Sequence, residues 1–161
     1  MTVISVTGHM DLTEESTQLV RDALLELLGR HTDGQLTGVS CLAKGADSLF
    51  AEAVLARRGR LVAVIPSADY RTAKVKPEFA EQFDQLRHAA TEVTVMPFPE
   101  ANRAAYEAAN HELLRRADLL VAVWDGRPSA ARGGTADTVA AARAAGLPVE
   151  IVWPEGAARK G

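Results

Sequence analysis

Residues 36–65 read LTGVSCLAKGADSLFAEAVLARRGRLVAVI, and this stretch decides the fold. Two short apolar runs, Leu36–Ser40 and Leu61–Ile65, flank a segment with helical periodicity, and a polar turn containing glycine precedes that segment. Runs that are apolar throughout, without strict alternation, are typical of strands buried on both faces of a sheet. A strand, a helix and a second strand in this order predict a right-handed parallel crossover.

The same pattern continues on both sides of this stretch. Further apolar or β-branched runs occur at Val3–Thr7, Glu92–Met96, Leu119–Trp124 and Pro148–Trp153, and segments with helical periodicity lie between them. We therefore expect an α/β fold, a three-layer Rossmann-like sandwich with a mostly parallel sheet of about six strands.

The predicted helices carry recognisable start and stop signals. The first has candidate caps in Asp11 and Thr13 and ends at Gly29. A later helix begins at Pro77, because proline lacks only an N–H that a first helical turn leaves unpaired in any case. These signals agree with the periodicity of the apolar residues.

Length and composition indicate one soluble domain. With 161 residues, 47% of them hydrophobic, the chain fits a single domain at 1–154, and the segment 155–161 has no apolar face and is expected to fray. Cys41 is the only cysteine, and we find neither a secretion signal nor a run long enough to cross a membrane, which predicts a cytoplasmic protein. The net charge of −3 argues against nucleic acid as a partner.

The turn after the second strand is a candidate anion site, because ligands of open parallel sheets bind at the carboxyl ends of the strands. Gly45 permits a close backbone approach, Lys44 supplies a cation, and Asp47 or Ser48 opens a helix whose free amides favour a phosphate or carboxylate. An ordinary strand-to-helix turn capped by Asp47 explains the same residues. Both interpretations stay open.

The loop after the fifth strand has similar features. Gly133 and Gly134 form a turn that exposes the backbone, Thr135 offers a capping hydroxyl, and Arg132 and Arg127 supply positive charge. A flexible surface loop is the alternative. Two glycine turns that open helices at one edge of the sheet predict a phosphorylated ligand.

Other side chains reach the same predicted crevice. Asp125 follows the fifth strand and could bond a sugar hydroxyl or stabilise a positive centre, or simply cap a turn. His9, next to Gly8, is the histidine placed to reach the pocket. Tyr106 and Asn110 share a helix face, where they could stack on and read a base, or form an ordinary half-buried pair.

Several common catalytic motifs do not occur. The sequence contains no GxGxxG, GxxxxGK[ST], GxSxG or HExxH pattern. Hydride transfer on a standard dinucleotide fingerprint, ATP hydrolysis and zinc chemistry therefore lose support, and we predict neither a cofactor nor a metal site. Cys41 is interpreted as a small packing residue rather than a nucleophile.

Two segments together resemble the SLOG superfamily, which joins the DNA-processing protein Smf/DprA to the Lonely Guy phosphoribohydrolases. SCLAKGADSLFAEAVLARRGRLVAVIPSADY, residues 40–70, resembles its first strand-turn-helix-strand unit. ADLLVAVWDG, residues 117–126, with RGGTADTVAAARAAGLPVEIVWP, residues 132–154, resembles its second half, including the glycine-threonine phosphate loop. The likeness spans almost the whole chain.

The resemblance implies a Rossmann-like sheet that binds a nucleotide across the two glycine loops, and a homodimer or higher homo-oligomer. Lonely Guy enzymes carry PGGxGTxxE with a catalytic glutamate, but Thr138 stands at the glutamate position here. Asp137 is one residue early, about 100° around the helix. The phosphate contacts implied by the resemblance are Lys44, Gly45, Asp47, Gly133, Gly134 and Thr135.

The expected function is the binding of a nucleotide or a nucleotide-derived phosphorylated small molecule. The alternative is a phosphoribohydrolase that cleaves the N-glycosidic bond of a nucleoside 5′-monophosphate, with Asp125 or Asp137 stabilising an oxocarbenium-like sugar and activating water. A third class, a DNA-binding accessory protein, would need a basic surface stripe that the acidic balance does not predict.

Overall fold

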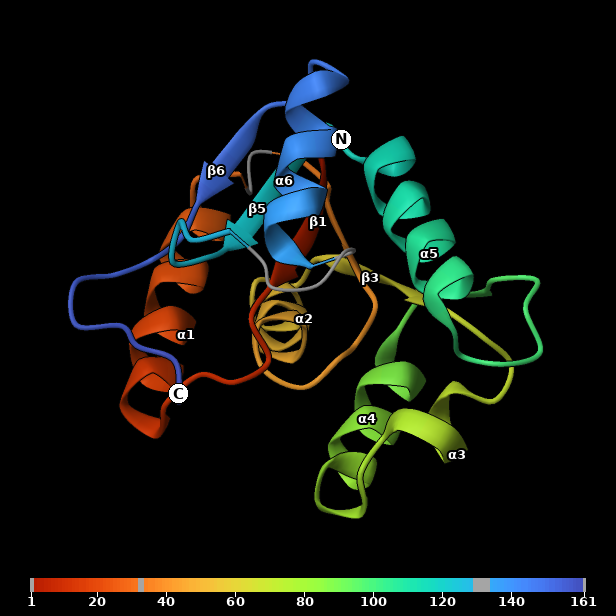
Figure 1. Ribbon diagram of the computed structural model, residues 1–161. Coiled ribbons are helices and arrows are strands. Elements are labelled where there is room, and N and C mark those ends of the chain that lie inside the picture. The colour runs from red at the N-terminus through yellow and green to blue at the C-terminus, as the bar shows by residue number, and fades with distance from the viewer. Residues whose placement is uncertain (1, 32–33, 129–133, 161) are drawn as a thin grey trace.

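The computed structural model describes residues 2–31, 34–128 and 134–160. Its centre is a six-stranded sheet in the order β4-β3-β2-β1-β5-β6, in which all neighbours pair in parallel. The predicted α/β three-layer fold is therefore confirmed (Figure 1). The strands are β1 Thr2–Gly8, β2 Leu36–Ser40, β3 Arg60–Ile65, β4 Glu92–Val95, β5 Leu119–Val123 and β6 Val149–Ile151.

The helices cover both faces of this sheet. Because crossovers are right-handed and the strand order reverses after β4, α1, α2 and α4 cover one face and α5 and α6 the other (Figure 1). A short helix, α3, lies in the long connection after β3. The helices are α1 Glu14–Gly29, α2 Ala46–Ala56, α3 Tyr70–Lys74, α4 Pro77–Ala89, α5 Arg103–Arg116 and α6 Thr135–Ala144.

The apolar strands are buried because helices pack on both of their faces. On one face Leu24, Phe50 and Phe83 are fully buried in the larger core cluster. On the other face Val64 and Leu113 belong to a second cluster beneath α5. This double burial explains why the strands read as continuous apolar runs rather than alternating ones.

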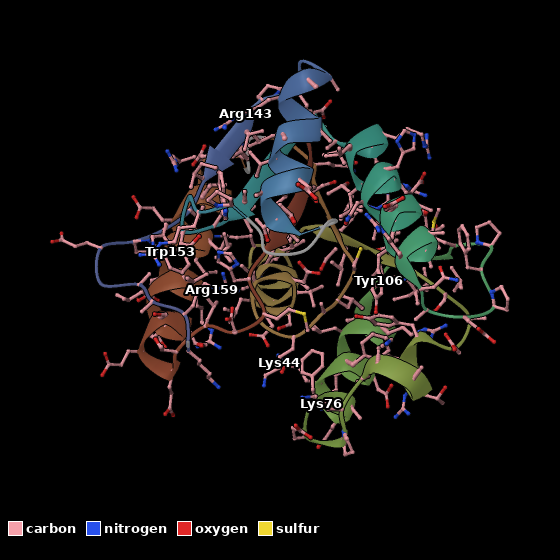
Figure 2. All side chains as sticks on the ribbon, viewed as in Figure 1. Lys44, Lys76, Tyr106, Arg143, Trp153 and Arg159 are labelled. Atoms are coloured by element: carbon pink, nitrogen blue, oxygen red, sulfur yellow. The ribbon has the colours of Figure 1, made fainter. Side chains whose placement is uncertain are left out.

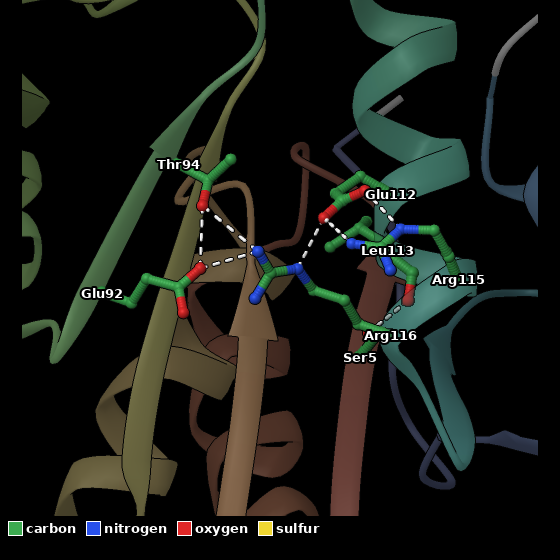
Figure 3. Close-up of polar contacts among 7 residues, drawn as sticks. All are labelled: Ser5, Glu92, Thr94, Glu112, Leu113, Arg115 and Arg116. Atoms are coloured by element: carbon green, nitrogen blue, oxygen red, sulfur yellow. Dashed lines mark hydrogen bonds and ion pairs between the residues drawn. The ribbon is translucent and has the colours of Figure 1, made fainter.

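Polar contacts fix α5 to the sheet (Figure 3). The buried Ser5 hydroxyl of β1 donates a hydrogen bond of 2.7 Å to the Leu113 carbonyl. Arg116, at the end of α5, places Nη2 2.6 Å from the Glu92 carboxylate and 3.2 Å from the Thr94 hydroxyl of β4. The helix is thus held at both the centre and the edge of the sheet.

Glu112 completes this network on the helix itself. Its carboxylate accepts hydrogen bonds of 2.8 and 2.6 Å from Arg115 and one of 2.6 Å from Arg116. The hydrogen bonds from Arg115, and then those from Arg116, lower the pKa of Glu112 to about 2, although burial acts in the opposite direction. Glu112 is therefore ionised at neutral pH.

A topological switch point lies between β1 and β5. The chain leaves β1 toward α1 on one face and leaves β5 toward α6 on the other, while the two strands pair up to Gly8 opposite Val123. Loops that diverge in this way leave a crevice at the carboxyl ends of the strands, which is where open α/β sheets bind ligands.

The C-terminal segment lies against the loop that follows β1 (Figure 1). The Thr13 amide donates to the Ala158 carbonyl at 3.1 Å, and the Ala158 amide donates to the Ser16 hydroxyl at 2.7 Å. The Lys160 amide donates to the Asp11 carbonyl at 2.7 Å. Where the sequence indicated a frayed tail, the structure has a segment paired with this loop.

Within the described residues, no helix has the length and the apolar character that a membrane crossing requires.

Candidate functional site

A cleft of about 940 Å³ opens at the carboxyl edge of the sheet, over the ends of β1 and β5. Its walls come from the loops after these strands, the start of α6, the end of β6 and the C-terminal segment. The structure brings together here six of the residues that the sequence indicated for the site, Gly8, His9, Asp125, Arg127, Gly134 and Thr135.

Gly8 allows the floor of the cleft to form. A Cβ at this position would lie 2.5 Å from the Cβ of Ala46 at the start of α2 and 2.8 Å from the Cβ of Val123 at the end of β5. Real Cβ atoms do not approach one another so closely, and both neighbours belong to packed elements. Glycine therefore lets the end of β1 pass between α2 and β5.

His9 is buried beneath the cleft, with 8% of its surface exposed. Its Nε2 accepts the Asp125 backbone amide at 3.2 Å and lies 3.3 Å from the Asp125 carboxylate. The Trp153 ring meets the imidazole edge-on, with the centroids 5.6 Å apart. Burial lowers the pKa of His9 and the Arg159 charge lowers it further, against the opposing effect of Asp125. The Asp125 amide requires a lone pair at Nε2 while the carboxylate favours a proton there, and the lowered pKa of His9 favours the neutral ring that accepts from the amide.

Arg159 and two carboxylates surround this histidine. Arg159 Nε lies 2.8 Å from Asp11 Oδ1, and its Nη1 lies 3.8 Å from Asp125 Oδ2. Burial raises the pKa of Asp125, but the Arg127 amide, His9 and Arg159 together outweigh it, so that the pKa is lowered. The cleft therefore offers an ionised carboxylate next to a guanidinium.

The start of α6 forms another wall of the cleft. Gly134 is the N-cap and brings no capping side chain, and the Thr135 amide has no acceptor among the described residues. Unpaired amides and the helix dipole favour a negative charge at such a position. Arg132 and Gly133, also expected here, lie outside the described residues.

The glycine turn before α2 is arranged differently. The Ala46 amide donates to the His9 carbonyl and the Ser48 amide to the Ala43 carbonyl, each at 3.1 Å. Gly45 has φ +88°, and a Cβ there would lie 2.7 Å from the His9 carbonyl oxygen. Gly45 and Ser48 do not line the cleft, and their contacts are those of a strand-to-helix turn packed on the loop after β1.

Asp47 and Cys41 lie beneath this turn. The Ala43 amide faces the Asp47 carboxylate at a long 3.4 Å, and burial raises the pKa of Asp47 to about 7. Burial also raises the pKa of the Cys41 thiol, and Asp47 raises it further, which agrees with a packing role for this cysteine. Lys44 points to a neighbouring pocket instead.

Three candidates lie away from the cleft. Tyr106 is half-buried and packs edge-on against Tyr70, with the ring centroids 6.4 Å apart. Asn110 and Asp137 line a separate pocket between α5 and α6. The sequence placed Asp137 about 100° around the helix from the position of the catalytic glutamate. The structure agrees, because the Asp137 carboxyl faces α5 and not the cleft.

Sequence reasoning missed two residues that shape the cleft, Trp153 and Arg159 (Figure 2). Trp153 follows β6, and the rule that ligands bind beyond the carboxyl ends of parallel strands would have found it. Arg159 had no such signal, because the segment that carries it has no periodic pattern.

With this geometry in place, comparisons with known proteins become informative. No protein-family model and no curated sequence matches the chain. Solved structures do match: DprA from Streptococcus pneumoniae, with a TM-score of 0.71 and 18% identity, covers 97% of this chain. The chain shares the fold of this structure. It spans 52% of the S. pneumoniae structure, about half of its length.

Two further structures share this fold. DprA from Helicobacter pylori has a TM-score of 0.66 and 15% identity, and the match covers 98% of this chain and 68% of that one. A molybdenum cofactor binding protein from Rippkaea orientalis has a TM-score of 0.59 and 17% identity over 93% of this chain and 75% of that one. The resemblance seen in the sequence is thus confirmed at the level of the fold.

The comparisons also correct one expectation. The net charge of −3 argued against nucleic acid as a partner, and that prediction is wrong, because the H. pylori DprA structure describes a single-stranded DNA binding mode on the SLOG fold. The error came from judging a local binding surface by the net charge of the whole chain. Net charge describes the whole surface, whereas binding depends on local charge.

Proposed function

We propose that the cleft binds a nucleotide or a nucleotide-derived phosphorylated small molecule. The observation that carries this proposal is the convergence, at the switch point of the sheet, of an uncapped helix start, a guanidinium and an indole ring. Each of these groups suits one part of such a ligand. The helix amides and Arg159 can bind a phosphate, and Trp153 can stack on an aromatic base.

Asp11 and Asp125 place two carboxylates in the cleft. Asp125 is ionised and can accept hydrogen bonds from sugar hydroxyls, while neutral His9 holds it in place through the Asp125 amide. Arg159 is already paired with Asp11, so an incoming phosphate would share that guanidinium. Because a guanidinium has five N–H donors, it can serve both anions.

The solved structures support a phosphate-bearing ligand in general terms. Single-stranded DNA appears with the H. pylori protein and the molybdenum cofactor with the R. orientalis protein. The two glycine turns do not contribute equally in our proposal, because only the α6 start lines the cleft. The homodimer and the cytoplasmic location remain predictions.

Gly134→Val is expected to abolish nucleotide binding without unfolding the protein. Gly134 has φ −77° and ψ −177°, an extended conformation that valine adopts, and the isopropyl group would project at the start of α6 where a phosphate is expected. A nucleotide at 100 times its Kd adds about 2.7 kcal/mol, or several degrees of Tm, to the parent protein. Thermal shift with a panel of nucleoside mono-, di- and triphosphates measures this.

Ala141→Val is the matched control, since Ala141 is exposed on the same helix and lines the other pocket. It should keep the nucleotide-induced shift of the parent. A full shift in the Gly134→Val protein would contradict the proposed phosphate position.

A hydrolytic function is the second candidate, and the position of Asp125 in the cleft favours it. In hydrolysis of AMP, the bond between the sugar C1′ and the base nitrogen breaks, water adds to C1′, and the base leaves with a proton. Asp125 would stabilise the oxocarbenium-like sugar and take the proton of the attacking water.

If the protein hydrolyses AMP, Asp125→Asn should lower the rate of adenine release by about 10²-fold or more. Asp137→Asn should leave the rate unchanged, because Asp137 lies in the pocket between α5 and α6. Chromatography of the released base measures both rates. Full activity of Asp125→Asn would refute the role of Asp125, and no adenine from the parent protein would refute this second function and leave the binding proposal intact.

A further inference from the structure

The lysines of this chain gather around one pocket. A hollow of about 250 Å³ lies next to the cleft and shares Met10 and Asp11 with it. Figure 2 shows Lys44 and Lys76 on the same side of the molecule, near the start of α2 and the loop before α4. The sequence has four lysines, and all of them line this hollow: Lys44, Lys74, Lys76 and Lys160. We call it the lysine pocket.

The charges of the lysine pocket are not compensated by the protein. Within residues 2–31, 34–128 and 134–160, none of these lysines forms an ion pair, whereas arginines form all of the pairs except the His9–Asp125 contact. Asp11, the carboxylate that lines the pocket, is 2.8 Å from Arg159 and is thus already paired. Like charges around one hollow repel each other, so this arrangement costs stability unless an anion occupies it.

The floor of the lysine pocket is apolar and firm. Phe79 and Tyr70 are buried, with 8% and 6% of their surface exposed, and Val75 lies between them in sequence. A polar rim on an apolar floor is the usual form of a small-molecule site.

We propose that the lysine pocket binds a small anion with two or three linked phosphates, such as the di- or triphosphate group of a nucleotide. Four ammonium groups match the charge of such a group better than that of a single phosphate. An extended phosphate backbone fits less well, because the lysines surround a hollow and the acidic Glu14, Glu15 and Glu78 follow closely in sequence on the neighbouring helix starts. This site is independent of the proposed nucleotide cleft.

Inorganic tripolyphosphate is the probe, since it carries neither base nor sugar. It should raise the Tm of the parent protein by several degrees, and the rise should shrink as salt increases from about 0.01 M to about 0.1 M. Lys74→Gln/Lys76→Gln should lose most of this rise, with an affinity at least about tenfold lower. Without the probe, its Tm should equal or exceed that of the parent, because repulsion is relieved.

Arg60→Gln/Arg143→Gln is the matched control. It removes the same charge from two exposed arginines that do not line the lysine pocket, one at the start of β3 and one near the end of α6, and Figure 2 shows Arg143 on the opposite side of the molecule from Lys44 and Lys76. It should keep the response to tripolyphosphate. A loss in the lysine variant alone would support the site, whatever happens to AMP binding in the cleft.

The remaining outcomes overturn the proposal. An equal loss in both double variants would show a general charge effect. Loss in Gly134→Val with retention in the lysine variant would place the anion in the cleft and leave the proposed function standing. No response of the parent to tripolyphosphate, whether or not it binds a single-stranded oligonucleotide, would show that no small polyphosphate binds there.

Discussion

Replacing Gly45 with alanine is expected to lower the free energy of unfolding by about 3–5 kcal/mol. Gly45 has φ +88° and ψ −128°, a region that side chains rarely adopt. The added Cβ would also lie 2.7 Å from the His9 carbonyl oxygen and 2.8 Å from Met10 Cα. These are backbone atoms of the loop that carries the cleft, so relief requires that the whole loop move.

Urea denaturation measures this loss as a lower midpoint at unchanged slope. Gly146→Ala is the control, because Gly146 has φ +75° but no atom within 4 Å of the added Cβ. Its cost should be that of the backbone conformation alone, about 1 kcal/mol. Equal losses in the two variants would mean that the contact between the α2 turn and the loop after β1 is not tight.

Asp47→Asn is expected to stabilise the protein at alkaline pH but not at acidic pH. Burial raises the pKa of Asp47 from 3.8 to about 7, so the folded state holds this proton more tightly than the unfolded chain. The stability of the parent protein should therefore fall, through this group, as the pH rises from about 4 to about 7. Asparagine keeps the acceptor for the Ala43 amide but does not ionise.

A pKa shift of this size corresponds to a free energy of about 4 kcal/mol. Because Asp47 is partly accessible to solvent, the expected gain in the free energy of unfolding at pH 8 is about 2 kcal/mol. Denaturant unfolding of both proteins at several pH values measures the difference, in which the effects of His9 and of the other titrating groups cancel. A difference that stays constant from acidic to alkaline pH would refute the assigned cause.

Local patterns were sufficient to predict most of the fold. The strands are buried on both sides and therefore read as apolar runs, and Pro77 begins α4 because its ring suits a first helical turn. Thr13 caps α1 through a 3.2 Å hydrogen bond from the Ser16 amide. Each of these features depends on residues close together in sequence, which is why the sequence alone reveals them.

The site could be predicted only where it follows the ends of strands. His9 and Asp125 do so, and both reach the cleft. Arg159 reaches it because backbone hydrogen bonds hold its segment on the loop after β1, and such bonds leave no mark in the pattern of side chains. The start of α2 looked like the start of α6, yet its first amides are taken up by His9 and Ala43.

The pairing of the C-terminal segment has one more consequence. Arg159 bridges to Leu12 in extended backbone, where successive side chains point to opposite sides, so Arg159 faces the cleft and Lys160 the lysine pocket. A deletion of one residue between β6 and Ala157 would reverse this alternation. Lys160 would then take the place of Arg159 at the cleft, and a mobile ammonium would stand where a bidentate, planar group now does.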